Sequence, residues 1–114
     1  MRTIEQILSK VPNKRENKDT TSHEFKKDLY DFFWEDKWRE RSILEVSCSR
    51  GFSSYLLSYL FKQVYAVDYE RDLLDFASKF NQDRGRKNIQ FIQCDIYRAP
   101  YWDKLPKADV VFLD

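Results

Sequence analysis

Residues 42–68 read SILEVSCSRGFSSYLLSYLFKQVYAVD and decide the fold. The apolar residues Ile43, Leu44 and Val46 form a run that is too short for a helical period. Such a run predicts a buried strand of the kind found inside parallel sheets. A turn of mostly small residues follows at 47–51, and a second apolar run, 64–67, ends at Asp68. We therefore expect two strands joined by a turn and a helix.

The helix between the two runs is indicated by apolar residues that fall on one side of a helical projection: Leu56, Leu57, Leu60 and Phe61. We expect Ser53 or Ser54 to cap its start. A helix start offers unpaired N–H groups, and Asp68 can accept hydrogen bonds from two ribose hydroxyls. The stretch therefore predicts a nucleotide-binding βαβ unit.

The residues of the turn argue against a dinucleotide fingerprint. A G-x-G-x-x-G motif that began at residue 47 would need glycine at positions 47, 49 and 52, and the chain has Ser47, Ser49 and Phe52. Phe52 is too large for the close packing of helix on strand that the third glycine permits. We therefore do not expect NAD as the ligand.

The turn instead resembles motif I of the class I S-adenosylmethionine-dependent methyltransferases, which is an acid followed by alternating glycines. Glu45 stands at the acid position, and Ser47, Ser49 and Gly51 stand at the glycine positions. The resemblance implies that S-adenosyl-L-methionine is the cofactor. It also implies that Glu45 orients the turn or meets the amino group of the methionine part, and that the backbone of residues 47–51, Cys48 included, contacts this part. A positive φ at residue 47 or 49 would weaken this binding, because serine lacks the freedom of glycine.

The same resemblance gives roles to the ends of the second and third strands. Asp68 would hold the ribose, and Tyr69 would pack on the adenine face. Residues 89–92 predict a third strand that finishes at Cys94 and Asp95. Asp95 would then bind the exocyclic amine of adenine, with the backbone N–H of Ile96 on a ring nitrogen. A helix cap or turn acid is the alternative reading of Asp95.

Residues 108–114 predict a fourth strand that ends in Asp114. In the resembled family the residue at this strand end projects toward the transferring methyl group, so Asp114 is the candidate catalytic residue. Related catechol methyltransferases bind a divalent metal through the equivalent acid, but their further ligands would lie beyond residue 114. We therefore predict no metal.

The predicted fold class is α/β, a Rossmann-like three-layer sandwich with a parallel sheet of order 3-2-1-4, preceded by N-terminal helices. We expect residues 1–41 to form a helical extension. Residues 42–114 would form the cofactor-binding domain, without the C-terminal strands of the family. The fourth strand would then be an apolar edge, which predicts a homodimer, a partner chain or a truncated version of a longer enzyme.

The N-terminal region predicts two helices. The first has apolar residues at helical spacing and ends before Pro12: Ile4, Ile7, Leu8 and Val11. The second starts with a capping box at 21–24 and runs to about Trp38. Its apolar residues, Phe25, Leu29, Phe32 and Phe33, would pack on the sheet, or would form a lid over the cofactor or a substrate-recognition surface. We interpret His23 as solvated rather than catalytic, because no nucleophile accompanies it.

Charge and composition limit the partners and the location. Twenty Lys and Arg stand against nineteen Asp and Glu, so no global field recruits nucleic acid or an anionic membrane. The basic turn 83–87 is interpreted as a solvated loop, too short for a nucleic-acid footprint. Cys48 and Cys94 have neither metal-site spacing nor the density of a disulfide scaffold. With no signal peptide and no membrane span, we expect a cytoplasmic protein.

Two functions remain open at this point. The first is a methyltransferase that transfers the methyl group of S-adenosylmethionine to an unidentified acceptor, with the protein mainly positioning the two. The second is a non-catalytic S-adenosylmethionine-binding half-domain that acts as a regulatory or partner subunit. Asp114 favours the enzyme, and the missing C-terminal half favours the binding module.

Overall fold

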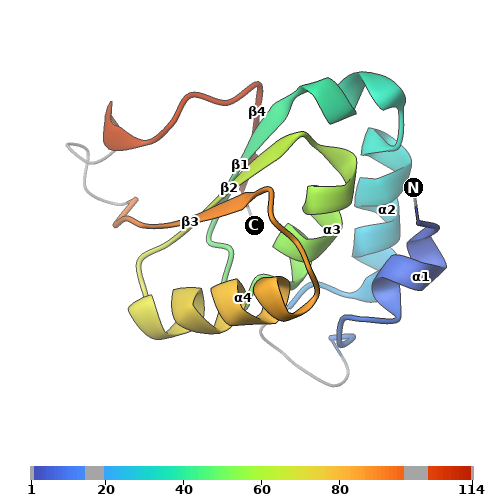
Figure 1. The fold of residues 1–114 in the computed structure, drawn as a ribbon, viewed down its shortest axis with the longest axis horizontal. Coiled ribbons are helices and arrows are strands. Elements are labelled where there is room, and N and C mark those ends of the chain that lie inside the picture. The colour runs from blue at the N-terminus through green and yellow to red at the C-terminus, as the bar shows by residue number, and fades with distance from the viewer. Residues whose placement is uncertain (1, 15–19, 97–102, 114) are drawn as a thin grey trace.

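A computed structural model describes residues 2–14, 20–96 and 103–113 (Figure 1). The sheet has four strands: β1 (Ser42–Val46), β2 (Gln63–Asp68), β3 (Ile89–Gln93) and β4 (Val110–Leu113). All neighbouring strands are parallel, and their order is β3-β2-β1-β4. The predicted Rossmann-like fold with strand order 3-2-1-4 is therefore confirmed.

The helices pack against one face of this sheet (Figure 1). They are α1 (Ile4–Leu8), α2 (His23–Phe33), the short 3-10 helix η1 (Asp36–Glu40), α3 (Phe52–Leu60) and α4 (Arg71–Asp83). Helix α3 connects β1 to β2, and α4 connects β2 to β3. Right-handed crossovers that proceed in one direction across a sheet place both helices on the same face.

The core lies between the helices and this face. Ile43 of β1 and Val64 and Ala66 of β2 are fully buried there against apolar residues of all four α-helices, because alternate residues of a strand point to the same side. The helix side chains are Ile7, Leu8, Leu29, Phe33, Phe52, Tyr55, Leu56, Leu57, Leu60, Leu74 and Phe80.

The opposite face of the sheet carries a smaller apolar cluster. Leu44, Val46 and Val67 are buried there, and Leu105 and Ala108 of the segment before β4 pack on them. The described residues thus supply two layers of the predicted three-layer sandwich, one of helices and one formed by the sheet. On the second face of the sheet they place the segment before β4. β4 is the edge strand of the described sheet next to β1, with Val111 and Leu113 exposed.

Helix α2 differs from the prediction at both ends. Its N-cap is Ser22 rather than Thr21, and the Ser22 hydroxyl accepts the Phe25 N–H. The helix ends at Phe33, and Trp38 lies in η1 with its ring 5.1 Å from that of Phe33. The chain is extended at Glu35, which separates the two helices.

The buried stripe of α2 also differs. It consists of Lys26, Leu29 and Phe33, which are spaced i, i+3 and i+7. Phe32 is 68% exposed and Phe25 is exposed as well, although Phe25 stacks on Phe112 of β4 with ring centroids 6.2 Å apart. The prediction that Phe25 and Phe32 belong to the packed face was wrong, because Lys26 occupies the position that Phe25 was expected to take.

His23 connects α2 to the segment after α1. Its ring Nε2 lies 3.0 Å from the carbonyl oxygen of Val11, and its backbone N–H donates to the Asn13 side chain. The expectation that His23 is solvated was wrong, because the chain folds back after α1 and brings this carbonyl to the ring. Val11 itself is buried beyond the end of α1.

Candidate functional site

The candidate site begins at the turn 47–51, which follows β1 at the C-terminal edge of the sheet. Val46 pairs with Val67 of β2 and with Leu113 of β4. The Cys48 N–H then donates to the Val67 carbonyl at 2.9 Å, which extends the pairing by one step. The Cys48 side chain is buried in the core, so only its backbone remains near the turn surface.

The turn holds three residues in the left-handed region, at alternate positions. Ser47 has φ 64°, Ser49 has φ 51° and Gly51 has φ 79°. The two serines therefore adopt the backbone conformation that glycine takes most easily. Each costs about 1–2 kcal/mol relative to a right-handed residue. The turn keeps the shape expected for an alternating glycine motif, and the positive φ at both serines is the condition under which weaker cofactor binding than with glycine is expected.

Gly51 starts α3 and packs against α4. It is the N-cap of α3, so the predicted caps Ser53 and Ser54 lie inside the helix, where both are buried. A Cβ at residue 51 would lie 2.7 Å from Ala77 Cβ and 2.9 Å from Asn81 Nδ2. This close approach allows Asn81 Nδ2 to donate to the Gly51 carbonyl at 3.1 Å.

Glu45 lies on the helix side of β1 and is fully buried. The Ser54 hydroxyl donates to its Oε1 at 2.5 Å. Because Ser54 is in the first turn of α3, this bond joins the end of β1 to the start of the helix, on either side of the turn. The structure thus places Glu45 beside the turn, bonded to the start of α3.

Asp68 ends β2 and faces the same turn. Its carboxylate accepts the Ser49 N–H at Oδ2 (2.9 Å) and the Glu70 N–H at Oδ1 (3.1 Å). The residue is only 7% exposed. Each carboxylate oxygen can accept a second hydrogen bond. Asp68 is therefore fixed by two backbone donors and keeps acceptor capacity for a pair of ligand hydroxyls.

The remaining predicted residues follow β2 and β3. Tyr69 is 58% exposed, and its carbonyl accepts a hydrogen bond from the Gln93 side chain. The Cys94 N–H donates to the Asp68 carbonyl at 3.0 Å, so Asp95 and Ile96 come directly after the point where β3 meets the end of β2. Both are half-buried. Asp114, the predicted catalytic residue, lies outside the described residues.

Two residues near the turn, Lys26 and Asn81, were not predicted from the sequence. Lys26 is fully buried, and its Nζ donates to Thr20 Oγ1 (2.7 Å), Thr21 O (2.7 Å) and Thr21 Oγ1 (2.8 Å). Thr21 Oγ1 lies 3.4 Å from the hydroxyl of Ser53 in the first turn of α3. The N-terminal extension therefore reaches the helix start beside the turn.

A signal for Lys26 was present in the sequence, since position 26 belongs to the i, i+3, i+7 stripe with Leu29 and Phe33. No comparable signal marked Asn81, the second missed residue, because its role depends on the approach of α4 to Gly51.

The described residues hold no candidate metal site and no candidate membrane span. In 2–14, 20–96 and 103–113, no group of three or more His, Cys, Asp and Glu could hold a metal ion. The same part of the chain has no helix with the length and apolarity needed to cross a membrane. Burial raises the pKa of the Cys94 thiol, and the neighbouring Asp95 carboxylate raises it further.

The model of a methyltransferase domain family matches residues 43–114, which include every strand of the sheet. A curated protein of Haemophilus influenzae, described as uncharacterized, is 31% identical over 72 residues. This match covers 63% of the chain and 26% of that protein.

Solved structures with the same fold include a precorrin-6y C5,15-methyltransferase from Geobacter metallireducens and the YcgJ protein from Bacillus subtilis. The first has a TM-score of 0.71 and 16% identity, and the match covers 85% of this chain and 50% of that one. The second has a TM-score of 0.67 and 19% identity, and the match covers 80% of this chain and 37% of that one. The chain therefore spans half or less of the length of these proteins.

Proposed function

Because the chain belongs to the methyltransferase domain family, we propose that it is an S-adenosylmethionine-dependent methyltransferase acting on an acceptor that its family does not identify. The observation that carries the proposal is the Asp68 carboxylate, bonded to the Ser49 N–H at the edge where β1 and β2 end. This arrangement brings an acceptor for ribose hydroxyls next to the turn 47–51, whose left-handed residues leave part of the backbone open to a ligand. These are the two features that the βαβ cofactor site needs.

The residues present fit the cofactor. The turn 47–51 has the backbone shape of an alternating glycine loop, and Gly51 lies where a Cβ would overlap Ala77. Because α4 closes off Gly51, a ligand approaches this backbone at the other end of the turn, where Ser47 is exposed. When bound, S-adenosylmethionine supplies an electrophilic sulfonium methyl group.

Each residue of the site has a proposed role in binding. Asp68 accepts hydrogen bonds from the ribose hydroxyls, and the exposed Tyr69 packs on the adenine face. Asp95 accepts from the adenine amine, and the Ile96 N–H donates to a ring nitrogen.

Glu45 holds the turn through Ser54. Asp114, at the end of the β4 segment, would be the residue beside the methyl acceptor. The contribution of the protein is then to hold two reactants in line.

Calorimetry with three ligands tests the proposal. We expect S-adenosylmethionine and its demethylated product to bind, and we expect NAD not to bind. Tight binding of NAD alone would overturn the assignment.

A second measurement separates an enzyme from a binding module. The protein is incubated with S-adenosylmethionine and a cell extract, and the demethylated product is quantified by mass spectrometry, with Asp68→Ala as the control. An enzyme produces more of the demethylated product than the Asp68→Ala control does. A regulatory half-domain binds S-adenosylmethionine but produces no more of the demethylated product than this control. A cytoplasmic location and pairing through β4 stay predictions.

A further inference from the structure

Basic residues from distant parts of the sequence gather at the C-terminal end of α4. Arg2 precedes α1, Lys10 follows it, and Arg84 follows α4. All three line one cavity of about 460 Å³, together with Tyr55 and Asp83. The turn 83–87 is therefore not an isolated basic loop, because the fold adds two N-terminal cations to it.

The charges of this group are not neutralised within the described part of the chain. None of Arg2, Lys10, Arg84, Arg86 and Lys87 forms an ion pair there, whereas Arg39, Arg71 and Lys79 do. The Asp83 carboxylate in the cavity already lies 3.4 Å from Lys79 Nζ. In a chain of net charge +1, this is a local concentration of positive charge.

Two of the guanidinium groups are held both by an aromatic ring and by hydrogen bonds. Arg86 lies 3.6 Å above the Tyr59 ring and donates to the Ser58 hydroxyl and carbonyl. Arg84 lies 3.6 Å above the Phe80 ring and donates to the Phe80 carbonyl. The basic turn was interpreted as solvated, and this was wrong for Arg86, which is half-buried. Fixed cations lose little side-chain entropy when an anion binds.

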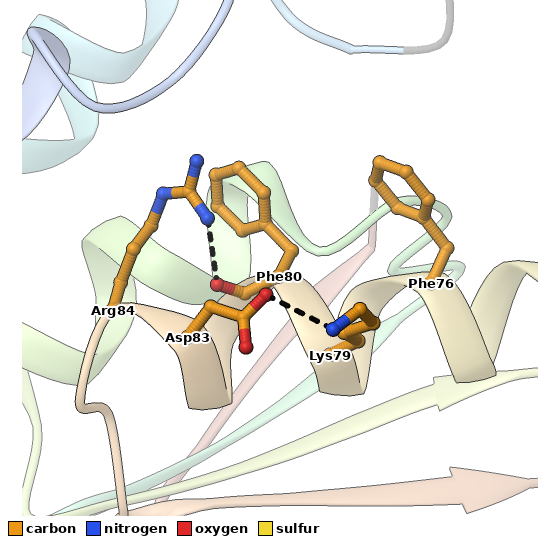
Figure 2. A pocket seen from close by; sticks show the side chains of 5 residues that line it. All are labelled: Phe76, Lys79, Phe80, Asp83 and Arg84. Atoms are coloured by element: carbon orange, nitrogen blue, oxygen red, sulfur yellow. Dashed lines mark hydrogen bonds and ion pairs between the residues drawn. The ribbon is translucent and has the colours of Figure 1, made fainter.

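An aromatic pocket adjoins the cationic cavity (Figure 2). It has a volume of about 220 Å³, and Asp83 and Arg84 line both spaces. Figure 2 shows Phe76 and Phe80 side by side along α4, with the Arg84 guanidinium at the Phe80 ring. Phe76 is 44% exposed, so a planar group can stack on it.

A second cationic cavity lies between α4 and β3. Its volume is about 300 Å³, and Arg86 and Lys87 are among the residues that line it. The turn after α4 thus contributes cations to more than one cavity. Phosphates repeated along a strand fit this distribution better than a single phosphate, and a base beside them fits Phe76.

We propose that this surface, formed by Arg2, Lys10, Phe76, Arg84 and Lys87, binds single-stranded nucleic acid. The phosphates contact the four cations, and a base stacks on Phe76. The proposal goes beyond the methyltransferase function and does not depend on it, since its four cations lie outside the turn 47–51 and the ends of β2 and β3 that form the cofactor site. Phe76 is the point where the two regions meet, because the Arg50 guanidinium of that turn lies 5.3 Å from its ring. A free nucleotide also carries a phosphate and a base, so it is compared with the single strand in the test below.

The test is fluorescence anisotropy with a labelled single-stranded oligouridylate of about ten nucleotides. We expect binding that weakens as salt rises from about 50 to about 200 mM, with a log–log slope near −3 if each of the four cations contacts about one phosphate. The double variant Arg2→Glu/Lys10→Glu should bind at least about tenfold more weakly. Lys27→Glu/Lys107→Glu makes the same charge change at two exposed lysines elsewhere and should stay within about twofold.

Three outcomes would overturn the proposal. The first is equal weakening in both double variants, which indicates nonspecific attraction. The second is uridine monophosphate or inorganic phosphate binding as tightly as the oligonucleotide, which indicates a single-anion site. The third is binding to anionic phospholipid vesicles with none to the oligonucleotide. Lys87→Glu gives a second measurement that does not alter the N-terminus, and thermal unfolding confirms that each variant is folded.

Discussion

The Asp68 carboxylate and the Ser49 amide are joined by a hydrogen bond of 2.9 Å between Oδ2 and N. Ser49 is in the left-handed region at this point, so its N–H is directed at β2 by the shape of the turn. The same carboxylate accepts the Glu70 N–H just before α4. One side chain therefore positions the turn, the strand end and the helix start, and it is also the proposed ribose ligand.

Replacing Asp68 with alanine should weaken S-adenosylmethionine binding about ten- to a hundredfold. A hydrogen bond to a charged group contributes roughly 1.5–3 kcal/mol, which corresponds to this range. Calorimetry measures the affinity, and Asp72→Ala, at an exposed acid in the first turn of α4, is the matched control. Unchanged affinity in Asp68→Ala would show that the ribose role is wrong.

Replacing Ser49 with glycine should raise the free energy of unfolding by about 1 kcal/mol, because the left-handed backbone is strained for serine and not for glycine. Urea unfolding measures the change. Ser78→Gly, within α4, is the matched control and should lower the stability by about 0.5 kcal/mol. A loss of stability in Ser49→Gly similar to that of the control would contradict the strain.

Replacing Lys26 with methionine should lower the free energy of unfolding by about 1–3 kcal/mol. The substitution keeps a long apolar side chain but removes the donor for Thr20 and Thr21, whose oxygens lose their buried partner. Lys27→Met, at the exposed neighbouring position, should change the stability by less than about 0.5 kcal/mol. Equal effects of the two variants would exclude a structural role for the Lys26 ammonium group.

The stability should also depend on Tyr55 at alkaline pH. Burial, together with the hydrogen bond to the Tyr59 hydroxyl, raises the pKa of Tyr55 to about 12. Because the folded pKa exceeds the unfolded value of about 10, the contribution is complete below pH 10 and is lost as the pH rises toward 12. Urea unfolding of Tyr55→Phe should therefore show a smaller fall in stability over this range than the wild type. Tyr69→Phe, at a tyrosine that is 58% exposed, is the matched control, and equal falls in Tyr55→Phe and wild type would contradict the shift.

The sequence predicted the sheet well because its signal is local. Each strand is a short apolar run, and Asp68 ends the run of β2 where the prediction placed it. The strand order is that of the doubly-wound topology with right-handed crossovers, which no single residue of this chain needs to specify. The position of Asp68 beside the turn could be predicted for the same reason.

The errors came from contacts between segments distant in the sequence. Phe25 and Lys26 are adjacent, and only the packing of α2 on the rest of the fold decides which of them is buried. The hydrogen-bond partner of the His23 ring, the Val11 carbonyl, depends on the path that the chain takes after α1. The grouping of Arg2 and Lys10 with Arg84 could not be read from a chain in which they are more than seventy residues apart.

The turn 47–51 is held from three sides, by Asp68 after β2, by the bond between Glu45 and α3, and by Asn81 of α4. Its backbone freedom is thus lost when the domain folds. A molecule that enters this edge meets a surface that is already rigid, so its association includes no ordering step and its entropic cost is confined to its own immobilisation.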